Sequence, residues 1–116
     1  MGLPIHITKA PGSYRIRVGD HVIGQTDQAL LLDEAGNRPV IYVPRDAIIP
    51  AALEPTSRNS TCPYKGEASY FSVLTPGLAP GGKLDNVVWS YATPKASVAA
   101  IAGYLAFYPA VTVEKV

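Results

Sequence analysis

Apolar and polar side chains alternate through the first part of the chain, the period-two pattern of half-buried strands. Gly19 and Asp20 separate two of these runs, and a two-residue connection that begins with glycine favours a type II′ hairpin turn. Gly24 lies inside the following run, where glycine indicates a bulge or the close approach of another backbone. The strands predicted here cover residues 5–8, 14–18 and 21–25.

The rest of the chain carries similar β-rich runs, separated by turn and proline signals. Residues 33–37 form a clear turn sequence, and residues 45–53 are at most a short helical turn because Pro50 breaks a longer helix. The polar residues 55–61 predict a loop, and the proline- and glycine-rich residues 76–82 predict a hairpin tip. The remaining predicted strands cover residues 29–32, 40–43, 67–74, 85–91 and 111–113.

Near the C-terminus the period changes from that of a strand to that of a helix. Thr93 suits the N-cap position and Pro94 the first helical position, so a helix is predicted over residues 93–107. Pro109 ends it. The apolar stripe of this helix consists of Val98, Ile101, Ala102 and Leu105.

These elements predict a single α+β domain over residues 1–116, dominated by strands. About seven short antiparallel strands would curl into a sandwich or a partly open barrel, accompanied by one C-terminal helix. Hydrophobic residues make up 47% of the chain and charged residues 16%, which is a globular composition. A chain of this length buries a core without disulfides or metals.

The charge balance and the cysteine count narrow the functional classes. The net charge of +1 without a basic block argues against general nucleic-acid binding, although recognition of one nucleotide stays open. A single cysteine forms no intramolecular disulfide and fits a reducing compartment. We see no signal peptide, and the longest apolar run, residues 99–106, is too short to span a bilayer. We therefore expect a cytoplasmic protein without a membrane segment.

Four blocks of sequence carry a family resemblance. They are residues 42–46 (YVPRD), 60–68 (STCPYKGEA), 86–91 (NVVWSY) and 99–108 (AAIAGYLAFY). In this order, over nearly the whole chain, they resemble the domain-of-unknown-function 427 family. The resemblance implies a small, mainly β domain of the tent-like type, in which two sheets fold against each other, with one helix. A nucleotidyltransferase-like label is sometimes attached to the family.

The chemistry behind that label has little support in the sequence. Nucleotidyl transfer uses paired carboxylates to hold two divalent metals on the phosphates, and the acidic residues here include no Asp-x-Asp pair on one strand. There is no glycine-rich phosphate loop, and one cysteine cannot build the pair of Cys-x-x-Cys zinc knuckles found in some tent-like proteins. No metal site is predicted, and the cofactor is unknown. The acidic residues considered are Asp27, Asp33, Glu34, Asp46, Glu67 and Asp85.

The densest group of reactive side chains surrounds the only cysteine. Cys62, Lys65 and Glu67 flank a proline–glycine turn and are the candidate catalytic residues. A nearby cation favours the thiolate, so Cys62 could act as a nucleophile; the alternative is a buried thiol packed beside Tyr64. Lys65 and Glu67 could form an ion pair on a solvated face, or they could face a ligand.

Aromatic residues near this turn could line a pocket for a planar ligand. If strands 67–74 and 85–91 pair, one face of the sheet becomes an aromatic floor; alternatively, the rings only fill the core. Arg45 and Asp46 follow a strand end, where loops commonly carry function, and a local salt bridge is equally consistent with them. The candidate ligand-binding residues are Arg45, Tyr64, Lys65, Tyr70, Trp89 and Tyr91.

Three functional hypotheses follow. The first is a small-ligand-binding domain, with or without enzymatic activity, in which Lys65 neutralises an anionic group, Glu67 orients the ligand or accepts a proton, and the aromatics stack. The second is a cysteine-dependent enzyme that uses Cys62 as its nucleophile. The third is a non-catalytic module whose sheet edges and apolar helix mediate self-association into a homo-oligomer or other interactions.

Overall fold

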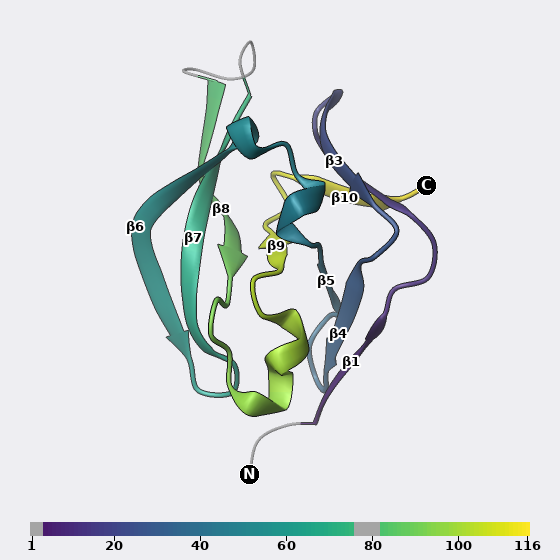
Figure 1. The fold of residues 1–116 in the computed structure, drawn as a ribbon, viewed down its shortest axis with the longest axis vertical. Helices are drawn as coiled ribbons and strands as arrows, with labels where there is room; N and C mark the ends of the chain where they lie inside the picture. The colour runs from purple at the N-terminus through teal and green to yellow at the C-terminus, as the bar shows by residue number, and fades with distance from the viewer. Residues whose placement is uncertain (1–3, 76–81) are drawn as a thin grey trace.

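Antiparallel β-strands dominate the computed structural model, which describes residues 4–75 and 82–116 (Figure 1). Three short 3-10 turns accompany them in this part of the chain. The elements are β1 (Ile5–Lys9), β2 (Tyr14–Val18), β3 (His21–Thr26), β4 (Leu30–Glu34), β5 (Val40–Tyr42), η1 (Arg45–Ala47), η2 (Pro50–Ala52), β6 (Leu53–Cys62), β7 (Gly66–Leu74), β8 (Lys83–Ser90), η4 (Ala96–Ile101), β9 (Leu105–Phe107) and β10 (Thr112–Lys115).

The strands form three antiparallel sheets, and none of them closes into a barrel. Their strand orders are β1-β4-β5, β10-β2-β3 and β6-β7-β8-β9. Figure 1 shows the four-stranded sheet on one side of the molecule and the two smaller sheets on the other. The prediction of a mainly β, antiparallel fold is therefore confirmed.

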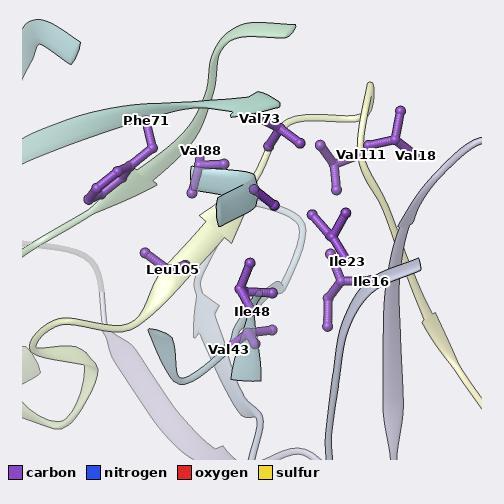
Figure 2. Close-up of a cluster of buried hydrophobic side chains, with 11 residues drawn as sticks. Ile16, Val18, Ile23, Val43, Ile48, Phe71, Val73, Val88, Leu105 and Val111 are labelled. Atoms are coloured by element: carbon purple, nitrogen blue, oxygen red, sulfur yellow. The ribbon is translucent and has the colours of Figure 1, made fainter. Parts of the chain in front are cut away.

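Two hydrophobic clusters lie on opposite faces of the same strands. Neighbouring residues on a strand point to opposite faces, so Tyr42 enters one cluster and Val43, which follows β5, enters the other. Tyr70 and Phe71 of β7 divide in the same way. Figure 2 shows the first cluster, in which side chains of β2 and β3 meet side chains of β7, β8 and β9, together with Val43 beyond the end of β5. Its fully buried members include Ile16, Ile23, Val43, Val73, Val88 and Leu105.

A reciprocal pair of backbone hydrogen bonds joins the sheet of β5 to the sheet of β9. The Val43 amide donates to the Leu105 carbonyl at 2.8 Å, and the Leu105 amide donates to the Val43 carbonyl at the same distance. Both residues are fully buried. This connection fixes where the two sheets meet.

The hairpin predicted at Gly19 and Asp20 is confirmed, since Val18 pairs with His21 across a two-residue turn. Gly19 has a φ of +56°, as the first central residue of a type II′ turn requires. The register of β2 and β3 shifts beside Gly24, which marks a bulge. Gly24 also lies against the backbone of η1, and a β-carbon there would clash with the Ala47 carbonyl oxygen.

The predicted C-terminal helix is wrong. The chain instead forms η4, which is interrupted by a non-helical conformation at Val98, and then β9, which pairs with β8. A continuous helix would direct Val98, Ile101 and Leu105 to one face, but the first two enter one cluster and Leu105 enters the other. Thr93 is not the N-cap; Lys95 occupies that position without a side-chain cap. Packing of this segment against both clusters thus outweighs the helical spacing of its apolar residues.

The prediction of a polar loop over residues 55–61 is also wrong, because these residues belong to β6. They are polar because most of their side chains are exposed at an edge of the four-stranded sheet, and exposure does not prevent backbone pairing with β7. The pairing shifts register between Pro55 and Asn59. Pro55 lacks an amide hydrogen, which is tolerated at a bulge or an edge.

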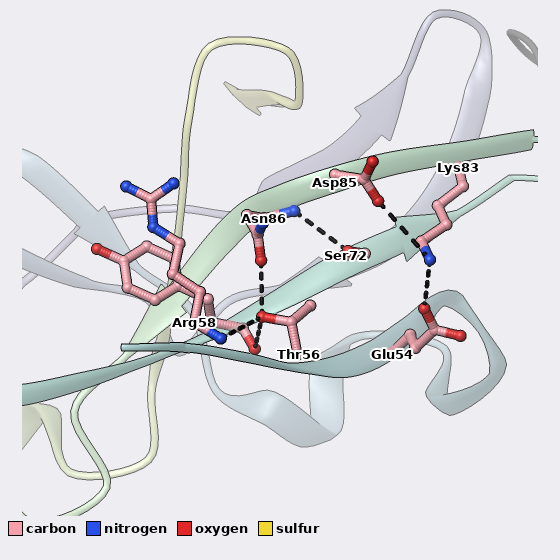
Figure 3. A network of polar contacts seen from close by, with 8 residues as sticks. Glu54, Thr56, Arg58, Ser72, Lys83, Asp85 and Asn86 are labelled. Atoms are coloured by element: carbon pink, nitrogen blue, oxygen red, sulfur yellow. Dashed lines mark hydrogen bonds and ion pairs between the residues drawn. The ribbon is translucent and has the colours of Figure 1, made fainter. Parts of the chain in front are cut away.

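A second irregularity in this sheet is held by side chains (Figure 3). Asn86 adopts a positive φ of 54° where the register of β7 and β8 shifts. The Thr56 hydroxyl donates to the side-chain oxygen Oδ1 of Asn86 at 2.6 Å. The backbone amide of Asn86 donates to the Ser72 hydroxyl at 3.1 Å. These bonds satisfy polar groups that the bulge removes from the ladder.

The predicted hairpin tip at residues 76–82 falls, except for its last residue, outside the described residues. Among the helical segments that the structure describes, none has the length and apolar character needed to cross a bilayer.

Replacing Gly24 with alanine tests the close approach of η1 to β3. The added β-carbon would meet Ile48 Cδ1 at 2.7 Å as well as the Ala47 carbonyl. We expect Gly24→Ala to lower the free energy of unfolding by about 1–3 kcal/mol. Urea denaturation measures this, with Gln25→Ala at the neighbouring exposed position as the control. Equal stabilities of the two variants would contradict the close contact.

Candidate functional site

A cavity of about 260 Å³ opens between the β4–β5 side of the molecule and the four-stranded sheet. Five aromatic residues line it: Tyr42, Tyr70, Trp89, Tyr91 and Tyr108. Its charged lining residues are Glu34, Arg38 and Lys65. Segments distant in sequence therefore contribute to one site.

The strand pairing explains why the rings gather on one face. Tyr70 of β7 lies directly opposite Trp89 of β8, so their side chains share a face of the sheet. Tyr91 lies two residues beyond Trp89 and lines the same cavity. The two strands do pair, which was the condition for an aromatic face, and the same rings also belong to a core cluster.

The opposite wall is joined to this face by a hydrogen bond. The Trp89 indole nitrogen donates to the Tyr42 hydroxyl at 3.3 Å. Tyr42 is 1% exposed and comes from β5. The Tyr108 ring lies 4.7 Å from the Trp89 ring, centre to centre, at an interplanar angle of 54°. Trp89 therefore connects both walls of the cavity.

Lys65 forms an ion pair inside this largely apolar environment. Its Nζ atom lies 3.0 Å from Glu34 Oε1, and both side chains are 12% exposed. Lys65 belongs to the turn between β6 and β7, whereas Glu34 ends β4. A residue outside this turn also holds it in place. The Lys95 backbone amide donates to the Lys65 carbonyl at 2.9 Å. The pair thus bridges two sheets at the cavity.

The cavity holds Lys65 in its charged form and its buried tyrosines in the neutral form. Burial lowers the pKa of Lys65, but the hydrogen bond to Glu34 and nearby negative charges outweigh this, so the net pKa is raised. Burial is also the largest cause of the raised pKa of Tyr42 and of Tyr91. Both phenols therefore remain hydrogen-bond donors at neutral pH.

An arginine extends the positive charge beyond the lining residues. The Arg58 guanidinium lies 4.9 Å from the centre of the Tyr70 ring. The Tyr70 hydroxyl is 2.8 Å from the Ser60 hydroxyl, so β6 fixes the orientation of this ring. Figure 3 shows Arg58 projecting from β6 beside the Asn86 network.

The structure brings together four of the residues singled out in the sequence: Lys65, Tyr70, Trp89 and Tyr91. It does not bring Arg45, Tyr64 or Glu67 to the cavity. Arg45 instead stacks over Phe71 at 4.7 Å and lines a separate cavity with Asp46. Tyr64 is 42% exposed, and Glu67 is exposed on β7. Lys65 therefore pairs with Glu34 rather than with Glu67.

Cys62 is a free, half-buried thiol at the end of β6. It packs against the hydrophobic cluster that contains Tyr42, Tyr70 and Tyr91. The residue thus lies close to the cavity without being one of its lining residues.

Sequence reasoning missed four charged or aromatic lining residues, Glu34, Arg38, Tyr42 and Tyr108, together with Leu32, Asn37 and Val40. Tyr42 and Tyr108 lie within two of the blocks that carry the family resemblance, which is a signal that could have drawn attention to them. In the sequence, Glu34 stands out only as one of several acidic residues that could hold a metal. No local pattern indicates that it meets the β6–β7 turn.

These features belong to an antiparallel β domain with an aromatic, charged cavity. The chain belongs to the family described as Domain of unknown function (DUF427), whose model matches residues 6–116. The short name of that family model is NTP_transf_9. No match was found among curated proteins. Within the described residues, no group of three His, Cys, Asp or Glu side chains could hold a metal ion.

The Lys65–Glu34 pair can be tested with a double-mutant cycle. Removing one partner leaves the other charge poorly solvated, so Lys65→Met and Glu34→Gln should each cost about 1–3 kcal/mol of stability. The double variant should cost less than the sum, because neither charge is then left alone. Urea denaturation measures all three.

The exposed pair between Lys83 and Glu54 provides the matched control. Its atoms lie 2.8 Å apart, but the side chains are 41% and 44% exposed. Lys83→Met should cost at most about 1 kcal/mol. Costs that simply add in the Lys65 cycle would show that the two charges do not interact.

The raised pKa of Tyr91 predicts a pH dependence at alkaline pH. The unfolded phenol ionises near its ordinary pKa of 10.0, whereas the folded state keeps Tyr91 protonated. The contribution of this group to stability is therefore complete below pH 10.0 and is lost as the pH rises towards the folded pKa. Tyr91→Phe should flatten the alkaline fall in the free energy of unfolding, measured in urea between pH 8 and about 11. An unchanged slope would contradict burial of the hydroxyl.

Proposed function

We propose that this domain binds a small organic molecule whose planar group lies against the aromatic rings of the cavity. The observation that carries the proposal is the unfilled space of about 260 Å³ between five aromatic side chains. Three of these rings, Tyr42, Tyr70 and Tyr91, are also buried in the second cluster, so the same side chains fill the core and line the open cavity. Small-molecule sites are typically concave, mostly apolar and furnished with a few polar groups.

Lys65 is the polar group that we assign to ligand recognition. An ammonium group has three donors, and Glu34 accepts from one of them. The remaining donors can contact an acceptor on the ligand. Glu34, rather than Glu67, holds Lys65 in position in this arrangement.

The neutral tyrosines add donors of fixed position. The Tyr42 hydroxyl accepts from Trp89, which leaves its own hydrogen free to donate. Its ring is buried and immobilised by the second cluster. A ligand would therefore meet a largely pre-formed site, which lowers the entropy cost of binding.

The other two hypotheses have less support. Cys62 is half-buried against an aromatic cluster, a setting that suits a packed thiol as well as a reactive one. For self-association, the strongest feature is the exposed polar edge of β6.

A thermal-shift screen of nucleosides, aromatic acids and other planar metabolites tests the proposal. Ligands that bind only the folded state raise its melting temperature. We expect a hit whose shift disappears in Lys65→Ala and persists in the control Lys83→Ala, which removes an exposed ion pair. The same hit should change the fluorescence of Trp89, the only tryptophan in the chain. A shift that is equal in both variants would place the ligand elsewhere.

A further inference from the structure

We propose that the ligand is an aromatic acid: a single planar ring carrying a carboxylate or phosphate group whose charge is recognised by Arg38. This inference rests on the proposed function and names the class of molecule that the cavity selects. Its basis is the balance of charge at the cavity, the position of Arg38 and the volume available.

The charges at the cavity leave a positive excess. Glu34 is compensated by Lys65 at 3.0 Å, whereas Arg38 lines the cavity and forms no ion pair with any residue that the structure describes. Arg58, over the Tyr70 ring, likewise has no carboxylate partner among the described residues. An anion would therefore be attracted to this site.

Aromatic walls alone would also suit a cationic ligand, because ring faces attract cations. The charged side chains argue for the opposite sign. Among the described residues, the lining holds one carboxylate, Glu34, which is already paired, and a cation beside it would be repelled by Lys65 and Arg38. The guanidinium group is also the side chain best matched to a carboxylate or phosphate, since it can donate two parallel hydrogen bonds.

Arg38 combines a place in the cavity lining with exposure to solvent, which suits a recognition group for an incoming anion. It is exposed and lies in the loop between β4 and β5, four residues after Glu34. An anion bound there would leave its ring to extend towards Trp89 and the tyrosines.

The volume limits the size of the ring system. Pockets for drug-sized molecules measure about 300–1,000 Å³, and this cavity, at about 260 Å³, is smaller than that range. One ring with one anionic group fits this space better than a nucleotide, which adds a sugar and a second ring.

The test is an NMR titration of the full chain with benzoate, phenyl phosphate, benzamide, benzylamine and adenosine monophosphate. The indole N–H of the single tryptophan gives one reporter signal from the cavity wall. We expect benzoate or phenyl phosphate to bind at least about tenfold more tightly than benzamide, the uncharged analogue of benzoate. Arg38→Gln should remove most of this difference and leave the affinity for benzamide unchanged.

Arg15→Gln is the matched control, because Arg15 lies on β2 in a different sheet and pairs with Glu114 at 3.5 Å. It should leave every affinity unchanged. Benzamide or benzylamine binding as tightly as the acids, or no effect of Arg38→Gln, would overturn the inference while leaving ring binding intact. Tighter binding of adenosine monophosphate than of benzoate would overturn the size argument. If no probe shifts the indole signal, both this inference and the proposed function fail.

Discussion

The constraint on which the rest of the structure depends is burial on both faces of the chain at Tyr42 and Val43, in the second half of β7 and in β9. A strand of this kind sends successive side chains into different clusters, so Tyr42 and Val43 cannot share a core. The reciprocal hydrogen bonds between Val43 and Leu105 fix the distance between two sheets at this point. A slip of one residue there would move every side chain of the strand to the wrong face.

The cavity is a consequence of this arrangement. On one face, branched aliphatic side chains pack closely, as the cluster in Figure 2 shows. The other face carries large flat rings, and a hydrogen bond from the Trp89 indole to the Tyr42 hydroxyl joins rings from two sheets. The cavity lies among these rings. The aromatic residues therefore both build the wall and define the site.

Much of the fold was predictable because strand alternation and turn chemistry are local. The hairpin at Gly19 and the bulge at Gly24 follow from neighbouring residues, and alternation within β7 and β8 puts Tyr70 and Trp89 each on one face of its strand. The prediction of a C-terminal helix was wrong because Val98 and Leu105 pack into different clusters. The spacing of apolar residues along the chain cannot reveal this. The same limit applies to the site. The sequence indicated Lys65 and Trp89, but Glu34 reaches Lys65 only through the meeting of two sheets.

The ion pair between Lys65 and Glu34 is difficult to explain by stability alone. Removing two charges from water costs several kcal/mol per ion, and their attraction commonly only offsets that cost. Apolar residues of similar size would hold the two sheets together at least as well. The pair, however, leaves ammonium donors beside aromatic rings in a cavity that a ligand can enter. On the function proposed above, the pair serves recognition, and Glu34 keeps Lys65 charged and correctly oriented.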